Sequence, residues 1–375
     1  MVSFLLAPLL VTLAVASVAS QSTGRSSGID LAQPLTLRWR YASDLTLNLT
    51  PAFDEDSLYV PLSGGNLVAL KAADGQLRWR SEIGGELSAS PVADDERIYV
   101  ASEIGGAAVN ATGRRAATGT LRSLGREGGV TQWMRTLARP IKGALTLVNG
   151  RLFGGGSDGK IYAFDAPTGE VRWVFQYSAP FNAQPVMAEA RVYVGSEDGT
   201  LLALEEESGR LLWRYRSKGP IRGPAAVANG TIYFGSGDGY VYAINTRDGK
   251  MRWRKRTGAG VQAVARVGGG LLVASLDNFV YLYSLDGTRV WKRQLPGRIS
   301  SQPFTTNDGA LFTPLSSSAA VALGLHDGRP VNSLPTDEEL TTTASPIGVG
   351  DAVFVTTQHG LLAFAQPRNG KRPAP

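Results

Sequence analysis

Four segments of the chain end in tryptophan and follow one pattern: LVALKAADGQLRW at residues 67–79, IYAFDAPTGEVRW at 161–173, LLALEEESGRLLW at 201–213 and VYAINTRDGKMRW at 241–253. Each begins with an apolar run, continues through a short turn that contains glycine, and ends with a second run that carries the tryptophan. Two such runs on either side of a glycine turn are typical of paired antiparallel strands. The pattern therefore predicts a β-hairpin that recurs along the chain.

All seven tryptophans of the chain belong to this series. They are Trp39, Trp79, Trp133, Trp173, Trp213, Trp253 and Trp291, at successive spacings of 40, 54, 40, 40, 40 and 38 residues. Short strands repeated every ~40 residues are the signature of a β-propeller, the architecture that WD40 repeats also form. We interpret these tryptophans as structural residues that dock one blade on the next.

One repeat unit, residues 214–253, contains signals for four strands. We predict strands near 221–227, 231–235, 240–244 and 250–254, joined by turns that contain Asn-Gly or Asp-Gly. These dipeptides accept the positive φ that tight hairpin turns require. The predicted fold class is therefore all-β, with four-stranded antiparallel blades.

The tryptophan series also counts the blades. Forty residues past Trp291 lies Val331, where the Asp-Gly turn is kept and the tryptophan is not. Three further strands are predicted near 340–347, 352–357 and 361–365, and residues 35–40 form a fourth strand with no strand before it. Joining them gives an eight-bladed β-propeller, closed by the N-terminal strand completing the last blade. The alternative, a ring of seven blades, would leave residues 35–40 without a partner.

The ends of the chain differ in composition from the repeats. Residues 4–19 are almost wholly apolar and end in the small-x-small sequence Ser17-Val18-Ala19, which predicts a signal peptide over residues 1–20 and export to the periplasm or beyond, with an uncleaved anchor as the alternative. Residues 21–34 are predicted to be a flexible leader, residues 35–371 the propeller and residues 372–375 a tail.

The composition excludes several kinds of chemistry. The chain of 375 residues has no cysteine and two histidines, so disulfides, thiolate zinc sites, cysteine nucleophiles and a lipid anchor on cysteine are excluded. His326 precedes an Asp-Gly turn and His359 precedes a turn glycine, and no hydrolase, Walker or dinucleotide motif is found. We assign no catalytic, cofactor-binding or metal-binding residue.

The positions nine residues past each tryptophan mark are expected to line the central channel. They are Asn48, Ser88, Lys142, Asn182, Arg222, Gln262, Ser300 and Leu340. A water-filled channel requires polar residues in any case, but Lys142 and Arg222 could also form an anion-binding mouth. An insertion at 103–119, with Arg114 and Arg115, joins the second and third strands of its blade on the same face. We predict this face, with Lys142, Arg222, Asn182, Gln262, Arg114 and Arg115, as the partner-binding side.

Basic residues flank most of the tryptophans, as in Arg78/Arg80 and Arg252/Arg254. On the outermost strand of each blade they discourage edge-to-edge pairing. Attraction to anionic lipid, polysaccharide or nucleic acid is the alternative, but no nucleic-acid motif is present and we expect no nucleic-acid partner.

The motif Ala163-x-Asp165-x-x-Thr168-Gly169-x-x-x-Trp173 resembles the tryptophan-docking repeat of the pyrroloquinoline-quinone-like, or quinoprotein-type, propellers. The resemblance covers about residues 35–371 and implies eight blades. One branch of that family comprises quinone-dependent dehydrogenases, which are longer, carry an adjacent-cysteine disulfide and hold calcium. The other is the outer-membrane assembly branch, BamB, a periplasmic non-catalytic scaffold of about this size.

The length and the export signal favour the BamB-like branch, from which the missing lipid-acceptor cysteine departs. We therefore expect an exported, non-catalytic scaffold without cofactor, a monomer within a complex that binds another envelope protein. The alternatives are a quinone-dependent dehydrogenase or another ligand-binding secreted propeller.

Overall fold

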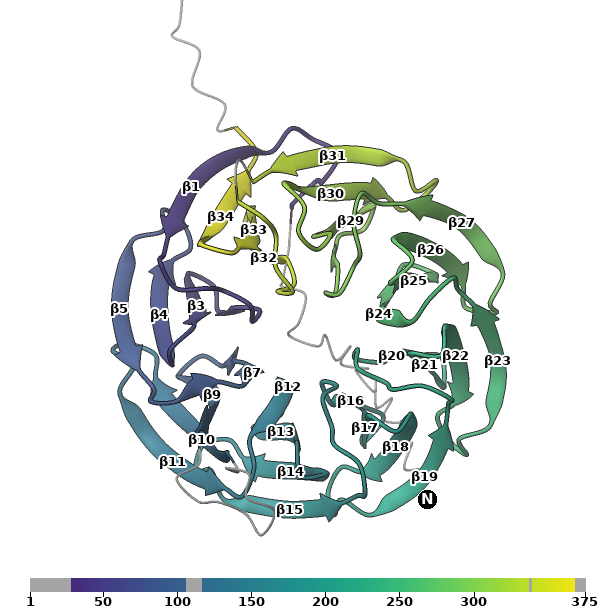
Figure 1. The fold of residues 1–375 in the computed structure, drawn as a ribbon, viewed down its shortest axis with the longest axis horizontal. Coiled ribbons are helices and arrows are strands. Elements are labelled where there is room, and N and C mark those ends of the chain that lie inside the picture. The colour runs from purple at the N-terminus through teal and green to yellow at the C-terminus, as the bar shows by residue number, and fades with distance from the viewer. Residues whose placement is uncertain (1–27, 106–116, 337–338, 368–375) are drawn as a thin grey trace, which may run out of the picture.

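Eight antiparallel sheets form a closed ring around a central channel in the computed structural model, which describes residues 28–105, 117–336 and 339–367 (Figure 1). The predicted all-β, eight-bladed propeller is confirmed. No helix in the described ranges is long and apolar enough to cross a membrane. The predicted signal peptide (1–20) and tail (372–375) lie outside the described residues.

The first four blades follow one another in chain order. Blade one comprises β2 (Ala52–Phe53), β3 (Ser57–Leu62), β4 (Asn66–Lys71) and β5 (Leu77–Glu82). Blade two comprises β6 (Glu86–Leu87), β8 (Val92–Ala93), β9 (Arg97–Ile104), β10 (Thr118–Gly125) and β11 (Thr131–Leu137). Blade three comprises β12 (Ile141–Val148), β13 (Arg151–Gly156), β14 (Lys160–Asp165) and β15 (Val171–Gln176), with β7 (Ala89–Ser90) paired in parallel to β12. Blade four comprises β16 (Val186–Ala188), β17 (Arg191–Gly195), β18 (Thr200–Glu205) and β19 (Leu211–Arg216).

The other four blades complete the ring. Blade five comprises β20 (Ala226–Ala228), β21 (Thr231–Gly235), β22 (Tyr240–Asn245) and β23 (Met251–Arg256). Blade six comprises β24 (Val261–Val267), β25 (Gly270–Ser275), β26 (Phe279–Ser284) and β27 (Arg289–Gln294). Blade seven comprises β28 (Phe304–Thr305), β29 (Gly309–Phe312), β30 (Ala319–Gly324) and β31 (Pro330–Pro335). Blade eight comprises β32 (Ile347–Val349), β33 (Ala352–Thr357), β34 (Gly360–Ala365) and the N-terminal β1 (Thr36–Ala42).

The innermost strands are shorter than the sequence indicates. In blade five we predicted a strand at 221–227, whereas β20 covers only Ala226–Ala228. Proline explains the difference, because it has no N–H to donate to a ladder. Six innermost strands begin one or two residues after a proline, at positions 51, 91, 185, 224, 303 and 346. Strand β12 also begins directly after a proline, Pro140, but it has Leu145 where the short strands have their proline, and β24 has no proline nearby; these two strands are the long ones.

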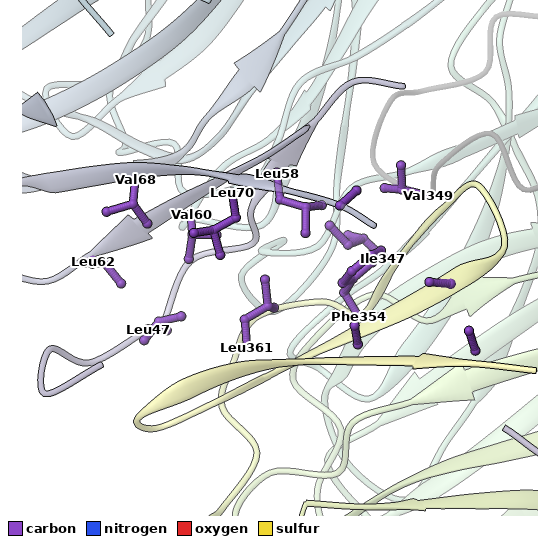
Figure 2. Close-up of a cluster of buried hydrophobic side chains, with 14 residues drawn as sticks. Leu47, Leu58, Val60, Leu62, Val68, Leu70, Ile347, Val349, Phe354 and Leu361 are labelled. Carbon is purple, nitrogen blue, oxygen red and sulfur yellow. The ribbon is translucent and has the colours of Figure 1, made fainter. Parts of the chain in front are cut away.

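The ring closes between the two ends of the chain. Strand β1 pairs antiparallel with β34, from Thr36 opposite Ala365 to Ala42 opposite Gly360, as predicted. Blade eight then packs on blade one through a core that includes Leu58 and Leu70 on one side and Phe354 on the other (Figure 2). Closure therefore combines main-chain hydrogen bonds with an apolar interface between blades.

The segment before β1 is part of the fold. Ile29, Leu31 and Leu35 are buried between blades seven and eight, with Leu31 only 1% exposed. The prediction of a flexible leader over 21–34 therefore does not hold for residues 28–34, because their apolar side chains fill the gap between two blades. Residues 21–27 lie outside the described residues.

Candidate functional site

Each tryptophan joins its own blade to the next one. Its indole N–H donates to a backbone carbonyl in the turn between the third and fourth strands of the following blade, at distances from 2.7 Å for Trp213 to 3.0 Å for Trp253. The seven acceptors are the carbonyl oxygens of Ala72, Arg126, Ala166, Glu206, Thr246, Leu285 and Leu325. The tryptophans therefore hold the blades in register and are unavailable for chemistry.

The receiving turn places a glycine directly on the indole ring. A Cβ on Gly209 would come within 2.5 Å of Cε3 of Trp173, and one on Gly249 within 2.9 Å of the ring of Trp213. Both glycines also have φ near +70°, in the region that favours glycine. Glycine is thus needed in these turns for two reasons: the backbone has a positive φ, and a side chain would clash with the docked indole ring.

The topology of the ring explains why the repeat has Val331 instead of an eighth tryptophan. A tryptophan there would need a turn between the third and fourth strands of blade eight, but those strands are β34 and β1, which come from opposite ends of the chain. Instead, Asn332 Nδ2 donates to the carbonyl oxygen of Gln33 at 2.8 Å, and the segment before β1 packs against blade seven. The N-terminal segment therefore takes the place of the missing docked turn.

Side chains next to the channel link neighbouring blades. Thr50 N donates to Ser90 Oγ at 3.1 Å, and Gln184 Nε2 donates to the carbonyl oxygen of Leu145 at 3.1 Å. Ser345 N donates to Thr50 Oγ1 at 2.9 Å, which joins blade eight to blade one. Sequence reasoning missed these residues, although Thr50, Ser90 and Gln184 all lie 11 positions past a tryptophan.

A cavity of about 200 Å³ lies in the channel and is lined by all eight blades. Asn182, Arg222, Gln262 and Ser300, four of the eight residues expected to line the channel, contribute to it. Gln184 and Gln302 add two further amides, and Gly143 and Gly223 add backbone. The lining thus combines these polar groups with many apolar side chains, among them Phe53, Leu145 and Met187, and Arg222 is the one charged residue among the described residues that line it.

Arg222 is held by a carboxylate that the sequence analysis overlooked. Its Nε and Nη2 donate to Glu197 at 3.0 and 2.9 Å, and Asn182 Nδ2 donates to the same carboxylate at 2.8 Å. The hydrogen bond from Arg222 is the main reason that the pKa of Glu197 is lowered, and Glu197 in turn raises the pKa of Arg222. The sequence did contain a signal for this residue. Glu197 occupies the variable position of the repeated turn Ser-x-Asp-Gly, where the next blade has Gly237, so a charged residue there is a departure from the repeat.

Lys142 is ion-paired in the same way. Its Nζ lies 2.6 Å from Glu103 Oε2, and Glu103 is at the end of β9, where the inserted segment begins. The structure thus places Lys142 beside the insertion. Arg114 and Arg115 themselves lie outside the described residues.

The two candidate cations are therefore compensated. Lys142 and Arg222 each have one carboxylate at hydrogen-bond distance, which neutralises their charge. The two cations therefore do not create the net positive potential on which the predicted anion-binding mouth depended. The channel face therefore offers amides, hydroxyls and two ion pairs next to the apolar side chains of the cavity.

The cavity lining does not fit the calcium site that a resemblance to the dehydrogenase branch would imply. Calcium takes six to eight oxygen ligands, usually with carboxylates among them. The cavity lining includes no Asp or Glu, and Glu197 is already engaged by Arg222 and Asn182. Among the described residues, no group of three or more His, Cys, Asp or Glu side chains could hold a metal ion.

The ring, its docked tryptophans and its channel define an eight-bladed propeller of the quinoprotein type. The family model described as outer membrane protein assembly factor BamB matches residues 26–116, 117–255 and 206–374, and the chain belongs to this family. None of the curated proteins matches the sequence.

Solved structures resemble the chain in fold. BamB from Moraxella catarrhalis is 16% identical, with a TM-score of 0.72 over 90% of this chain and 99% of that one. The quinohemoprotein alcohol dehydrogenase from Comamonas testosteroni is 13% identical, with a TM-score of 0.73 over 95% of this chain and 80% of that one. A europium-containing methanol dehydrogenase is 12% identical, with a TM-score of 0.70 over 88% and 93%. At these identities the likeness concerns the fold alone.

Proposed function

We propose that this chain is an exported, non-catalytic scaffold of the cell envelope that binds another envelope protein and takes part in outer-membrane protein assembly. Membership of the BamB family supports the general role. The observation that carries the proposal is the channel mouth, where amides and hydroxyls replace the carboxylate set that a calcium-dependent dehydrogenase needs.

The proposed partner side is the face that carries Glu103, Lys142, Glu197 and Arg222. Glu103 and Glu197 lie at or just after the ends of the second strands β9 and β17, so both ion pairs lie at the same end of their blades. Loops on a rigid ring are well placed for recognition, because the ring pre-organises them before a partner arrives. The partner would contact the amides of Asn182 and Gln262 there as well.

Site-specific photo-cross-linking tests this face. A photoreactive residue in place of Gln262, which lines the channel, should trap one envelope protein in intact cells. The same residue in place of Val171, which is 50% exposed on the outer wall, is the control and should trap little. Arg222→Glu, which sets two carboxylates against each other at Glu197, should abolish the cross-link from Gln262. Equal cross-linking from both positions would contradict a specific partner face.

The dehydrogenase alternative has its own measurement. Pyrroloquinoline quinone and calcium are added to the purified chain, and both binding and dye-linked alcohol oxidation are recorded. We expect neither. Saturable quinone binding with turnover would overturn the scaffold proposal, whatever the cross-linking shows. Fractionation of cells that express the chain with and without residues 1–20 tests export.

A further inference from the structure

Positive charge is concentrated on one side of the ring. Between residues 209 and 300 the chain has 16 basic and four acidic side chains, a net charge of +12, whereas the whole chain has +6. Cations flank most of the tryptophans, but their number is uneven around the ring. The excess falls on blades five and six and on the last strand of blade four.

The cations lie on three consecutive outer strands. Strands β19, β23 and β27 contain two, four and three cations and no acidic residue, whereas no other outer strand has more than two. The three strands follow one another along the outer edge of the ring (Figure 1). We call these nine residues the basic wall: Arg214, Arg216, Arg252, Arg254, Lys255, Arg256, Arg289, Lys292 and Arg293.

The basic wall is mostly uncompensated. Within the part of the chain that the structure describes, Arg216 is its one member with a carboxylate within 4 Å, Asp198 at 3.6 Å. Of the six cations on the other outer strands, four have a carboxylate within 4 Å, as Arg78 has Asp56 and Arg172 has Asp165. Carboxylate partners are therefore much rarer on the basic wall than on the other outer strands.

The acidic residues of this side are used in turns. Asp238 accepts from Tyr242 Oη at 2.7 Å and from the backbone N of Lys218 at 2.9 Å, and Asp277 accepts from Tyr281 Oη at 2.6 Å. Asp238 and Asp277 stabilise turns between second and third strands, and Asp248 and Asp286 lie in turns between third and fourth strands. Seven of the nine wall cations are exposed, and Lys292 and Arg293 are half-buried. Uncompensated positive charge of this density attracts an anionic surface.

The same strands expose apolar side chains beside the cations. Leu211, Met251 and Val290 are 37%, 48% and 55% exposed. A lipid headgroup layer offers both phosphates for arginine and an apolar boundary for such side chains, whereas a nucleic acid or an acidic polysaccharide offers no apolar layer. We propose that the basic wall is a docking surface for a bilayer that contains anionic phospholipids.

This surface is separate from the channel mouth. It uses the outer edge of blades four to six, so the ring can contact a bilayer with its side while its channel face stays open to a protein partner. The inference does not depend on the proposed function, because it rests on the wall alone.

Vesicle binding with matched variants tests the inference. The purified chain is sedimented with vesicles of phosphatidylcholine alone or of equimolar phosphatidylglycerol and phosphatidylcholine. We expect binding only to the anionic vesicles, weakening as salt is added. Arg214→Gln/Arg256→Gln removes two wall cations that make no ion pair with a described residue, and it should weaken binding about tenfold or more.

Two further variants separate the sources of binding. Arg78→Gln/Arg172→Gln removes the same charge from other outer strands and should leave vesicle binding within about threefold of the parent. Met251→Ser/Val290→Ser should weaken vesicle binding but not binding to polyglutamate. Urea midpoints show that each variant is folded. No binding to anionic vesicles, equal losses in the two arginine pairs, or polyglutamate binding as strong as vesicle binding with no effect of the serine pair would each overturn the inference.

Discussion

Replacing a docking glycine by alanine should measure how strongly one blade depends on the next. Gly209 has φ +69°, and its Cβ would lie 2.5 Å from Cε3 of Trp173. The indole cannot easily retreat, because its N–H is 2.8 Å from the carbonyl oxygen of Glu206 and the ring packs on Phe153. Gly209→Ala therefore adds a steric clash to a backbone cost.

The two contributions can be separated with a control. Gly150 has φ +70° and open space around its Cβ position, so Gly150→Ala carries the backbone cost alone, about 1–2 kcal/mol. Overpacking against a fixed ring adds about 1–3 kcal/mol, so Gly209→Ala should lower the free energy of unfolding by about 2–5 kcal/mol.

Urea unfolding followed by tryptophan fluorescence and by circular dichroism gives both free energies. The slope of the transition should be the same in the two variants, so that the midpoints can be compared directly. If Gly209→Ala and Gly150→Ala differ by less than about 0.5 kcal/mol, the ring adapts and the argument from docking geometry is refuted.

Three other predictions follow from charge and burial. Arg222 lowers the pKa of Glu197, so the stability that this ion pair gives the fold is full above the unfolded-state pKa of Glu197 and is lost as pH falls through the folded-state pKa. Glu197→Gln should therefore flatten the loss of thermal stability on acidification. A profile of melting temperature against pH that is unchanged in the variant would contradict this. Burial raises the pKa of Tyr162 to about 12, so the stability that its neutral hydroxyl contributes is full below the unfolded-state pKa and is lost as pH rises through the folded-state value. Tyr162→Phe should remove one late step from the ultraviolet titration of tyrosine, and loss of an early step instead would show a normal pKa. Leu31→Ala should cost about 2–5 kcal/mol in urea unfolding because Leu31 is 1% exposed, whereas Leu37→Ala, at a residue 45% exposed, should cost about 0.5 kcal/mol or less; equal costs would show that the N-terminal segment is not docked.

Most of the architecture could be predicted because the repeat carries its own register. The six tryptophans from Trp79 to Trp291 and the glycine turns before them mark the outer hairpins of blades one to six, and the unpaired N-terminal strand that carries Trp39 predicts closure. The inner strands were predicted less well. Proline before β16 and β20 stops the ladder, and the pairing of neighbouring inner strands depends on contacts between blades rather than on local pattern.

The channel mouth shows where prediction from sequence reached its limit. Positions counted from the tryptophans found Asn182, Arg222 and Gln262 in the cavity lining. They did not find Glu103 and Glu197, whose carboxylates change the charge of the mouth. Each is distant in the chain from the cation it holds, Lys142 or Arg222, so the ion pair exists only once blades stand next to one another.

By itself, the sequence determined the number of blades, the docking tryptophans and the two strands that close the ring, because these depend on periodic local signals. Only the tertiary structure decided which charged side chains have a partner of opposite charge and which do not. It paired Lys142 and Arg222 with carboxylates, and it placed one after another on the outer edge three strands whose cations mostly have no carboxylate partner among the described residues (Figure 1). Net charge along the chain is a local property, whereas the field of a surface depends on which side chains the fold brings within a few ångströms of each other.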